Sequence, residues 1–352
     1  ILIISVIFTI PTLIFLKPIL YFFGASEDTL PYAYDFMFII LSGTVITHLY
    51  FSFNALIRAS GQPLKSMTAT IMTVVVNVIL NPLFIFGFGW GMRGSALATI
   101  ISQVVVLVWQ LHLFNRHDSF LKIQRQALRF NSKIAFDSIA IGLSPFLMNA
   151  ASSVIVIIIN QGLLKYGGDM AVGAFGIVNR IAMLFVMIVI GLNQGMQPIA
   201  GYNYGARLYP RVTEVLKKSV IIATLIMSVG FLTAQLMPHQ IVSMFTSDHE
   251  LITHSERGLR IVFFFYPLIG FQMVVSTFFQ SIGKPGKAIF LSLTRQVIFL
   301  IPFLFILPHY YGISGVWIAM PASDAISIVM SALLIYAQIK EFRRAEAQSG
   351  VV

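Results

Sequence analysis

Long apolar stretches alternate with short polar connections along the whole chain. Each stretch has about 20 residues, the number of helical residues that crosses the roughly 30 Å hydrocarbon core of a bilayer. The connections contain turn-forming residues, as in Gly61-Gln62-Pro63 and Gly283-Lys284-Pro285. The pattern predicts ten membrane-spanning helices, at residues 1–23, 34–57, 66–88, 94–114, 134–160, 171–197, 214–238, 258–281, 288–307 and 314–338.

The composition agrees with this prediction. Of the 352 residues, 57% are apolar and only 10% are charged, and the mean hydropathy is +0.87. A soluble domain carries about 25% charged residues, so soluble enzymes and disordered chains are excluded. Because the chain has no cysteine, disulfides, Cys-ligated metals and thiol nucleophiles are excluded as well. The expected fold class is an all-α polytopic membrane protein.

The net charge of +10 indicates topology rather than a nucleic-acid partner, because the basic residues cluster between the apolar stretches. Alternate connections hold sixteen basic residues on one side and five on the other. The larger set is Arg58, Lys65, Arg116, Lys122, Arg125, Arg129, Lys133, Arg207, Arg211, Lys217, Lys218, Lys284, Lys287, Lys340, Arg343 and Arg344. The positive-inside rule places this set, and the C-terminus, in the cytoplasm. The sequence therefore predicts a multi-pass protein of the plasma (inner) membrane.

The chain also contains an internal repeat. The segments 58–65 and 280–287 share the pattern G-x-P-x-K, lie 222 residues apart, and each closes one predicted span and opens the next. Two extra spans precede the second copy, and the chain begins inside an apolar stretch without Met. We therefore expect a fragment that lacks two N-terminal helices, and an intact protein with a parallel 6+6 repeat.

This repeat predicts four regions. Residues 1–114 are the four-helix remnant of an N-terminal lobe, 134–340 form a six-helix C-terminal lobe, and 341–352 are a cytoplasmic tail. Residues 115–133 are a basic cytoplasmic linker, which suits either a solvated hinge or a contact with lipid or a partner.

The densest cluster of polar residues and glycines lies at the end of the sixth predicted span. It reads Q-G-M-Q-P-I-A-G-Y-N-Y-G-A over residues 194–206. This stretch resembles a motif of the multidrug and toxic compound extrusion (MATE) family of cation-coupled transporters, bacterial branch. The resemblance covers essentially the whole chain and implies a bundle of two helical lobes. The matching motif residues are Gln194, Gln197, Pro198, Gly201, Tyr202, Asn203 and Gly205.

A second matching stretch contains Asn77, Asn81 and Pro82, and is followed by Thr99 on the next span. Similar proteins carry N-x-x-x-D-P here, and its Asn and Asp form a cation site with that Thr and with an Asp on the first helix. The resemblance thus implies Asn77, Asn81 and Thr99 as cation-binding residues. In this chain Asn81 replaces the Asp, so none of the three can carry a proton near neutral pH. The alternative is that the two asparagines hydrogen-bond between helices.

Three charged residues lie well inside predicted spans, where each costs roughly 3 kcal/mol or more unless it has a partner or water. We expect Arg180 to face the bundle interior or a wet cavity. Arg295 and Asp324 could pair within the C-terminal lobe, or Asp324 could act in coupling. No metal site is expected beyond a possible Na⁺ site, since His48 has no further ligand at a suitable spacing.

The predicted function is secondary active efflux of small organic compounds, cationic or amphipathic, by Na⁺ or H⁺ antiport through alternating access. No cofactor is expected besides the coupling ion, and the expected state is a monomer in the lipid bilayer. The chain contains no P-loop, G-x-S-x-G or H-E-x-x-H motif, so it is not expected to be an enzyme. The alternatives are a lipid-linked oligosaccharide flippase of the same superfamily and a non-transporting membrane protein.

Overall fold

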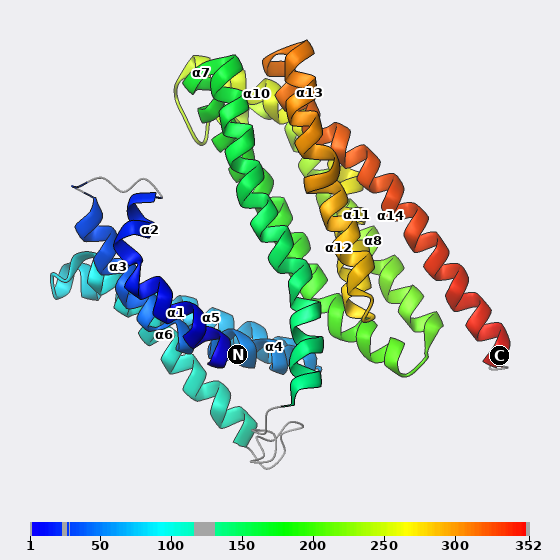
Figure 1. Cartoon of the computed structure of the whole chain (residues 1–352), viewed down its shortest axis with the longest axis horizontal. Helices are drawn as coiled ribbons and strands as arrows, with labels where there is room; N and C mark the ends of the chain where they lie inside the picture. Colours follow the sequence, from blue (N-terminus) through cyan, green and yellow to red (C-terminus); the bar gives the residue numbers. More distant parts are fainter. Residues whose placement is uncertain (1, 23–26, 28, 116–130, 350–352) are drawn as a thin grey trace. The chain divides into compact units, whose positions relative to one another are not determined.

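The computed structural model describes residues 2–22, 27, 29–115 and 131–349. Within these ranges the chain is helical and contains no β-strand (Figure 1). Contacts divide it into two compact units, residues 1–129 (unit 1) and 130–352 (unit 2). The division falls inside the predicted linker 115–133, of which residues 116–130 lie outside the described residues.

The described part of unit 1 contains six α-helices and one π-helix. They are α1 (Leu2–Ile14), α2 (Leu16–Phe22), α3 (Leu30–Ser42), α4 (Thr44–Ala59), α5 (Pro63–Pro82), η1 (Leu83–Gly87) and α6 (Gly91–Asn115). Helix α6 packs against α3, α4 and α5. The buried core of the unit is small and centres on Tyr50, Ala69 and Val106.

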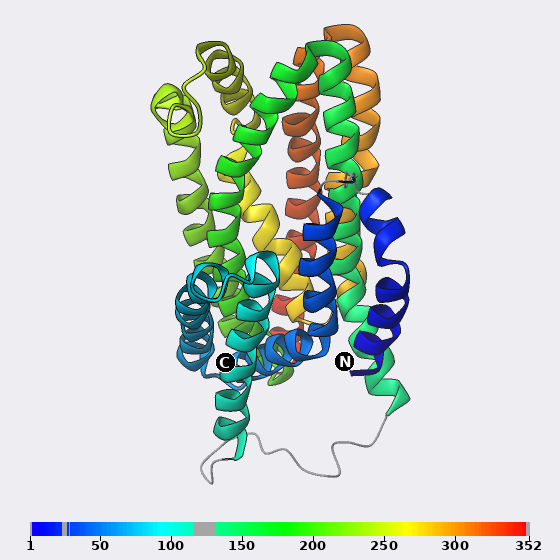
Figure 2. The same cartoon turned by 90° about the vertical axis from the view of Figure 1, so that its left-hand side faces the viewer.

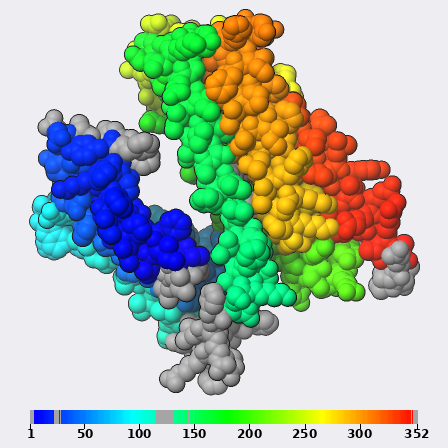
Figure 3. All heavy atoms as spheres, viewed as in Figure 1, coloured from blue at the N-terminus to red at the C-terminus, as the bar shows by residue number. Residues whose placement is uncertain are grey.

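Unit 2 begins with the long helix α7 (Ser132–Gly205). It continues with α8 (Tyr209–Leu236), α9 (Pro238–Val242), α10 (His249–Val262), α11 (Tyr266–Ser281), α12 (Pro285–Leu293), η3 (Thr294–Leu300), α13 (Ile301–Tyr311) and α14 (Ile313–Ser349). Helix α11 packs on α8, and the side chains of Met227, Phe278 and Phe279 are fully buried. In Figure 3 the first half of α7 is visible as a continuous green ridge on the surface of this unit.

Six described helical segments are long and apolar enough to cross a membrane, and two bent helix pairs bring the number to eight. The segments are Pro63–Gly87, Gly91–Phe114, Asn149–Gly205, Tyr209–Leu236, Pro285–Tyr311 and Ile313–Ala345, and the pairs are α3–α4 and α10–α11. The predicted spans 134–160 and 171–197 both lie in α7. At Gly168 the backbone leaves the helical region (φ 66°, ψ −167°), and the chain changes direction there (Figure 2). The predicted span 1–23 corresponds to α1 and α2, which meet at Phe15.

The internal repeat is visible in local geometry. Helices α3 and α4 bend by 53° at Gly43, and α10 and α11 bend by 55° around Phe265, 222 residues later. Gly61 and Gly283 both adopt positive φ, 80° and 71°, just before the prolines that begin α5 and α12. Only glycine adopts this conformation at little cost, so the repeated G-x-P pattern specifies the same turn twice.

Candidate functional site

Arg295 and Asp324 form an ion pair inside unit 2. The Arg295 Nε atom lies 2.6 Å from Oδ1 of Asp324, and the Asp324 side chain is only 7% exposed. Ser323 donates a hydrogen bond to the backbone carbonyl oxygen of Arg295. Arg295 lies in the π-helix η3, in which backbone hydrogen bonds join residues five positions apart instead of four. The pair fastens η3 to α14 and neutralises two charges within the membrane segment.

The structure brings two of the three predicted cation-site residues into contact. Asn77 of α5 donates a hydrogen bond from Nδ2 to Oγ1 of Thr99 on α6, at 3.3 Å. Thr99 in turn donates to the carbonyl oxygen of Ser95. Asn81 lies one turn after Asn77, and its Oδ1 atom is buried without a hydrogen-bond partner among the described residues. A buried amide oxygen without a donor is a free-energy cost that a bound cation would relieve.

Arg180 lies outside the packed core of unit 2, and the expectation that it faces the bundle interior or a wet cavity stays a prediction. Its side chain is exposed on the surface of unit 2. The reason is the orientation of α7, because Val178 and Ile181 are 1% and 2% exposed and occupy the packed side of the helix.

The motif 194–206 ends α7 and permits a close approach to α11. A Cβ atom at Gly201 would lie 3.0 Å from the carbonyl oxygen of Ser281, so a larger residue would push the helix ends apart. Asn203 donates to the carbonyl oxygen of Ile199, and its own carbonyl accepts from Leu208 across the turn that follows. The other motif residues lie on the surface or half-buried: Gln194, Gln197, Tyr202 and Gly205 are exposed, and Pro198 is half-buried.

Several polar contacts were not predicted from the sequence. Asn54 of α4 donates to Thr70 of α5 and accepts a short hydrogen bond from Ser66. In unit 2, Ser276 and Ser292 are 3.1 Å apart at the positions 222 residues after Asn54 and Thr70. The 222-residue offset of the repeat could have predicted that these positions pair in both units, because both partners shift by the same number of residues.

A second group of unpredicted contacts has no sequence signal. The buried side chain of Gln338 accepts hydrogen bonds from Lys284 and Lys287, and Lys284 also pairs with Glu341. In unit 1, Thr47 donates to Gln103 at 2.6 Å, and Ser5 hydrogen-bonds His48. Among the described residues no group of three His, Asp or Glu could hold a metal ion.

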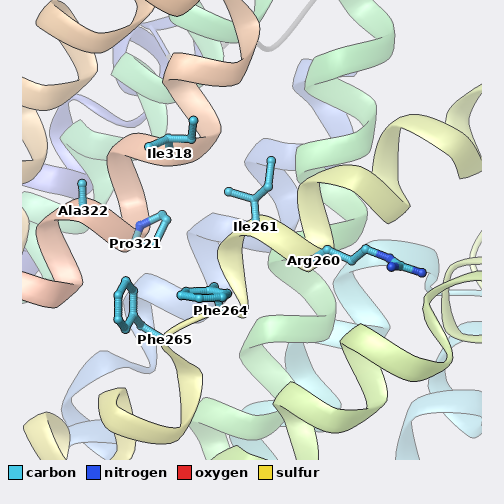
Figure 4. A pocket seen from close by; sticks show the side chains of 7 residues that line it. All are labelled: Arg260, Ile261, Phe264, Phe265, Ile318, Pro321 and Ala322. Atoms are coloured by element: carbon cyan, nitrogen blue, oxygen red, sulfur yellow. The ribbon is translucent and has the colours of Figure 1, made fainter.

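An apolar cavity of about 430 Å³ lies at the bend between α10 and α11. Figure 4 shows that its apolar side chains come from this bend and from α14, whereas the guanidinium of Arg260 points away from them. The lining residues are Arg260, Ile261, Phe264, Phe265, Ile318, Pro321 and Ala322.

Comparisons with known proteins agree with this architecture. The family model MatE matches residues 1–83 and 142–306. A multidrug export protein, MepA, from Staphylococcus saprophyticus is 25% identical over 338 residues, which are 95% of this chain and 74% of that protein. The MATE multidrug transporter DinF-BH, whose structure was solved as a complex, is 39% identical, with a TM-score of 0.86 over 96% of this chain and 76% of that one.

A MATE structure in the bent conformation superposes with a TM-score of 0.92 at 25% identity, over 98% of this chain and 77% of that chain. The model match covers more than half of the chain, and the fold agrees over nearly all of it. These matches also fit the apolar helices, which make the chain a multi-pass membrane protein. The chain therefore belongs to the MatE family, which is a family of membrane transporters and not of enzymes.

Proposed function

We propose that this chain works as a secondary active exporter that moves small organic compounds out of the cell in exchange for Na⁺ or H⁺. Multidrug efflux is the activity of the relatives that it matches along 95% of its length. The observation that supports antiport best is the Oδ1 atom of Asn81, which has no hydrogen-bond partner among the described residues and lies one helical turn after Asn77 on α5. Asn77 in turn contacts Thr99 of α6.

The oxygen atoms of Asn77, Asn81 and Thr99 would contribute neutral ligands to a transported cation. Amide and hydroxyl oxygens suit Na⁺, and they have no proton to exchange near neutral pH. Asp324 is the alternative coupling residue, but it already pairs with Arg295, so a coupling role requires that this pair opens. Of the two, the Asn77–Asn81–Thr99 group is the better-supported cation site. The C-terminus lies in the cytoplasm and the transporter acts as a monomer in this proposal.

The test uses the full-length protein in proteoliposomes, with dye efflux driven separately by an imposed Na⁺ gradient and an imposed pH gradient. Replacing Asn81 by Asp adds a charge to the site and should strengthen Na⁺-driven efflux. Asp324→Asn serves as the comparison in the other unit. Efflux that responds to neither gradient would contradict antiport. Efflux that is abolished only by Asp324→Asn, in protein shown to be folded after reconstitution, would move the coupling site to unit 2.

A further inference from the structure

His48 lies in α4 where this helix packs against α1. Its ring nitrogen Nδ1 is 2.5 Å from Oγ of Ser5, whose side chain is completely buried. The other ring nitrogen, Nε2, has no hydrogen-bond partner among the described residues, and it is not one of their buried polar atoms. One nitrogen of the imidazole is therefore held by a buried hydroxyl, while the other is accessible on unit 1.

The residue before His48 connects α4 to the candidate cation site. Thr47 donates a hydrogen bond to Oε1 of Gln103 on α6, at 2.6 Å. Gln103 is buried and lies one helical turn after Thr99, which accepts a hydrogen bond from Asn77. Polar contacts thus lead from Ser5 on α1, through α4 and α6, to α5.

The charged residues of the neighbouring helices do not pair with His48. Gln103 marks the level of His48 on α6, and Arg93 and His112 lie about 15 Å and 14 Å from Gln103 along that helix. Arg93 already pairs with Asp35 of α3 at 2.9 Å. Helix α1 has no titratable residue, and none of the others on the helices packed around His48 hydrogen-bonds to it: Tyr32 and Tyr34 of α3, Tyr50 and Arg58 of α4, and Lys65 of α5.

The internal repeat shows that this helix contact does not require a histidine. The 222-residue offset places Met227 and Gly270 at the positions of Ser5 and His48. These two residues are also neighbours, because a Cβ atom at Gly270 would lie 3.1 Å from Cγ of Met227. Unit 2 thus packs the same pair of helices with apolar residues, whereas unit 1 has a titratable side chain and a buried hydroxyl there.

We propose that His48 is the proton-binding residue of unit 1, through which a pH gradient drives efflux. This inference rests on the proposed efflux function. Histidine gains and loses a proton between about pH 5 and 8, whereas Asn77, Asn81 and Thr99 have no such group.

The contact with Ser5 suits a side chain that changes its charge. When neutral His48 donates from Nδ1 to Oγ of Ser5, the lone pair of Nε2 accepts the incoming proton, and the imidazolium returns it by the same nitrogen. The hydroxyl accepts in both states, so the contact with α1 survives protonation. The positive charge disfavours a second cation at the Asn77–Asn81–Thr99 group, so that H⁺ and Na⁺ replace one another in unit 1.

The test uses the full-length protein in proteoliposomes, with ethidium efflux driven by a pH gradient in the absence of Na⁺. His48→Gln keeps a hydrogen-bonding side chain that does not titrate, and should lower the rate at least about fivefold. His112→Gln makes the same replacement at an exposed histidine of α6 and should stay within about twofold of wild type. Fluorescence anisotropy of bound ethidium should be unchanged in both variants, which shows that they are folded.

A wild-type rate in His48→Gln, or equal losses in the two variants, would overturn the role of His48. So would wild-type efflux that responds to a Na⁺ gradient and not to a pH gradient, although the proposed function would stand. Wild-type efflux that responds to neither gradient would overturn the proposed function itself.

The titration of His48 is also measured in the wild-type protein, without any substitution. Diethylpyrocarbonate modifies neutral imidazole, and mass spectrometry of the peptides reports the modification of each histidine. Labelling of His48 should fall at least about fivefold from pH 7.5 to pH 5.5, as the ring takes up its proton. Labelling that does not change with pH, or that is absent at every pH, would overturn the proposal.

Discussion

The carboxylate of Asp324 lies 2.6 Å from the guanidinium of Arg295, and the neighbouring Ser323 hydrogen-bonds the Arg295 carbonyl oxygen. The two charged residues are therefore joined through both side chain and backbone, which fixes α14 against η3. Removing one partner leaves an uncompensated charge in a segment that excludes water.

Asp324→Asn should therefore destabilise the protein by about 3–5 kcal/mol, the cost of breaking a buried pair from one side. Replacing both residues by apolar ones of similar size, Arg295→Met with Asp324→Leu, should recover most of this loss. Thermal unfolding of the purified protein in detergent measures both effects. A double variant that is less stable than Asp324→Asn would contradict this reading of the pair.

The turn glycines of the repeat allow a matched comparison. Gly61→Ala and Gly283→Ala should each destabilise by about 1–2 kcal/mol, because both residues have positive φ, which disfavours any residue with a Cβ atom. Gly286 lies three residues after Gly283, in α12, with ordinary helical geometry and no atom near an added methyl group. Gly286→Ala should therefore be neutral or slightly stabilising. Equal losses at Gly283 and Gly286 would show that backbone conformation is not the cause.

The glycines of the motif at the end of α7 allow a second comparison of this kind. Gly201→Ala places a Cβ atom 3.0 Å from the Ser281 carbonyl oxygen, and Gly201→Val adds two more methyl groups at the same contact. We expect a loss of about 1–3 kcal/mol from the larger substitution. Gly205→Ala meets no atom within 4 Å and is the control. Expression level and melting temperature should fall in the order Gly205→Ala, Gly201→Ala, Gly201→Val, and any other order argues against close packing of α7 on α11.

Thr99→Val keeps the shape of the side chain but removes the hydroxyl that accepts from Asn77. If Thr99 contributes an oxygen ligand, the Na⁺ concentration needed for half-maximal efflux should rise severalfold in this variant, while Thr99→Ser should remain near wild type. Efflux assays at varied Na⁺ and fixed pH measure this. An unchanged Na⁺ dependence in Thr99→Val would leave the Asn77–Thr99 contact a purely structural one.

The sequence by itself determined the helical fold and the turns that separate its helices. Backbone groups in lipid must hydrogen-bond within their own helix, so the spacing of apolar stretches is enough to predict helices. The turns at Gly61 and Gly283 follow from local chemistry, because glycine supplies positive φ and proline starts the next helix. The pairing of Arg295 with Asp324 was open to prediction because a charge inside a span needs a partner.

Only the tertiary structure decided which side of each helix is packed. In a helix of a soluble protein, the polar side faces solvent. In α7 the exposed and the packed sides are both apolar, so the periodicity of apolar residues could not predict on which side of the helix Arg180 lies. The contacts of Gln338 with Lys284 and Lys287, and of Thr47 with Gln103, join residues more than 50 positions apart. Such contacts depend on how the helices pack against one another, which the local pattern of apolar and polar residues does not specify.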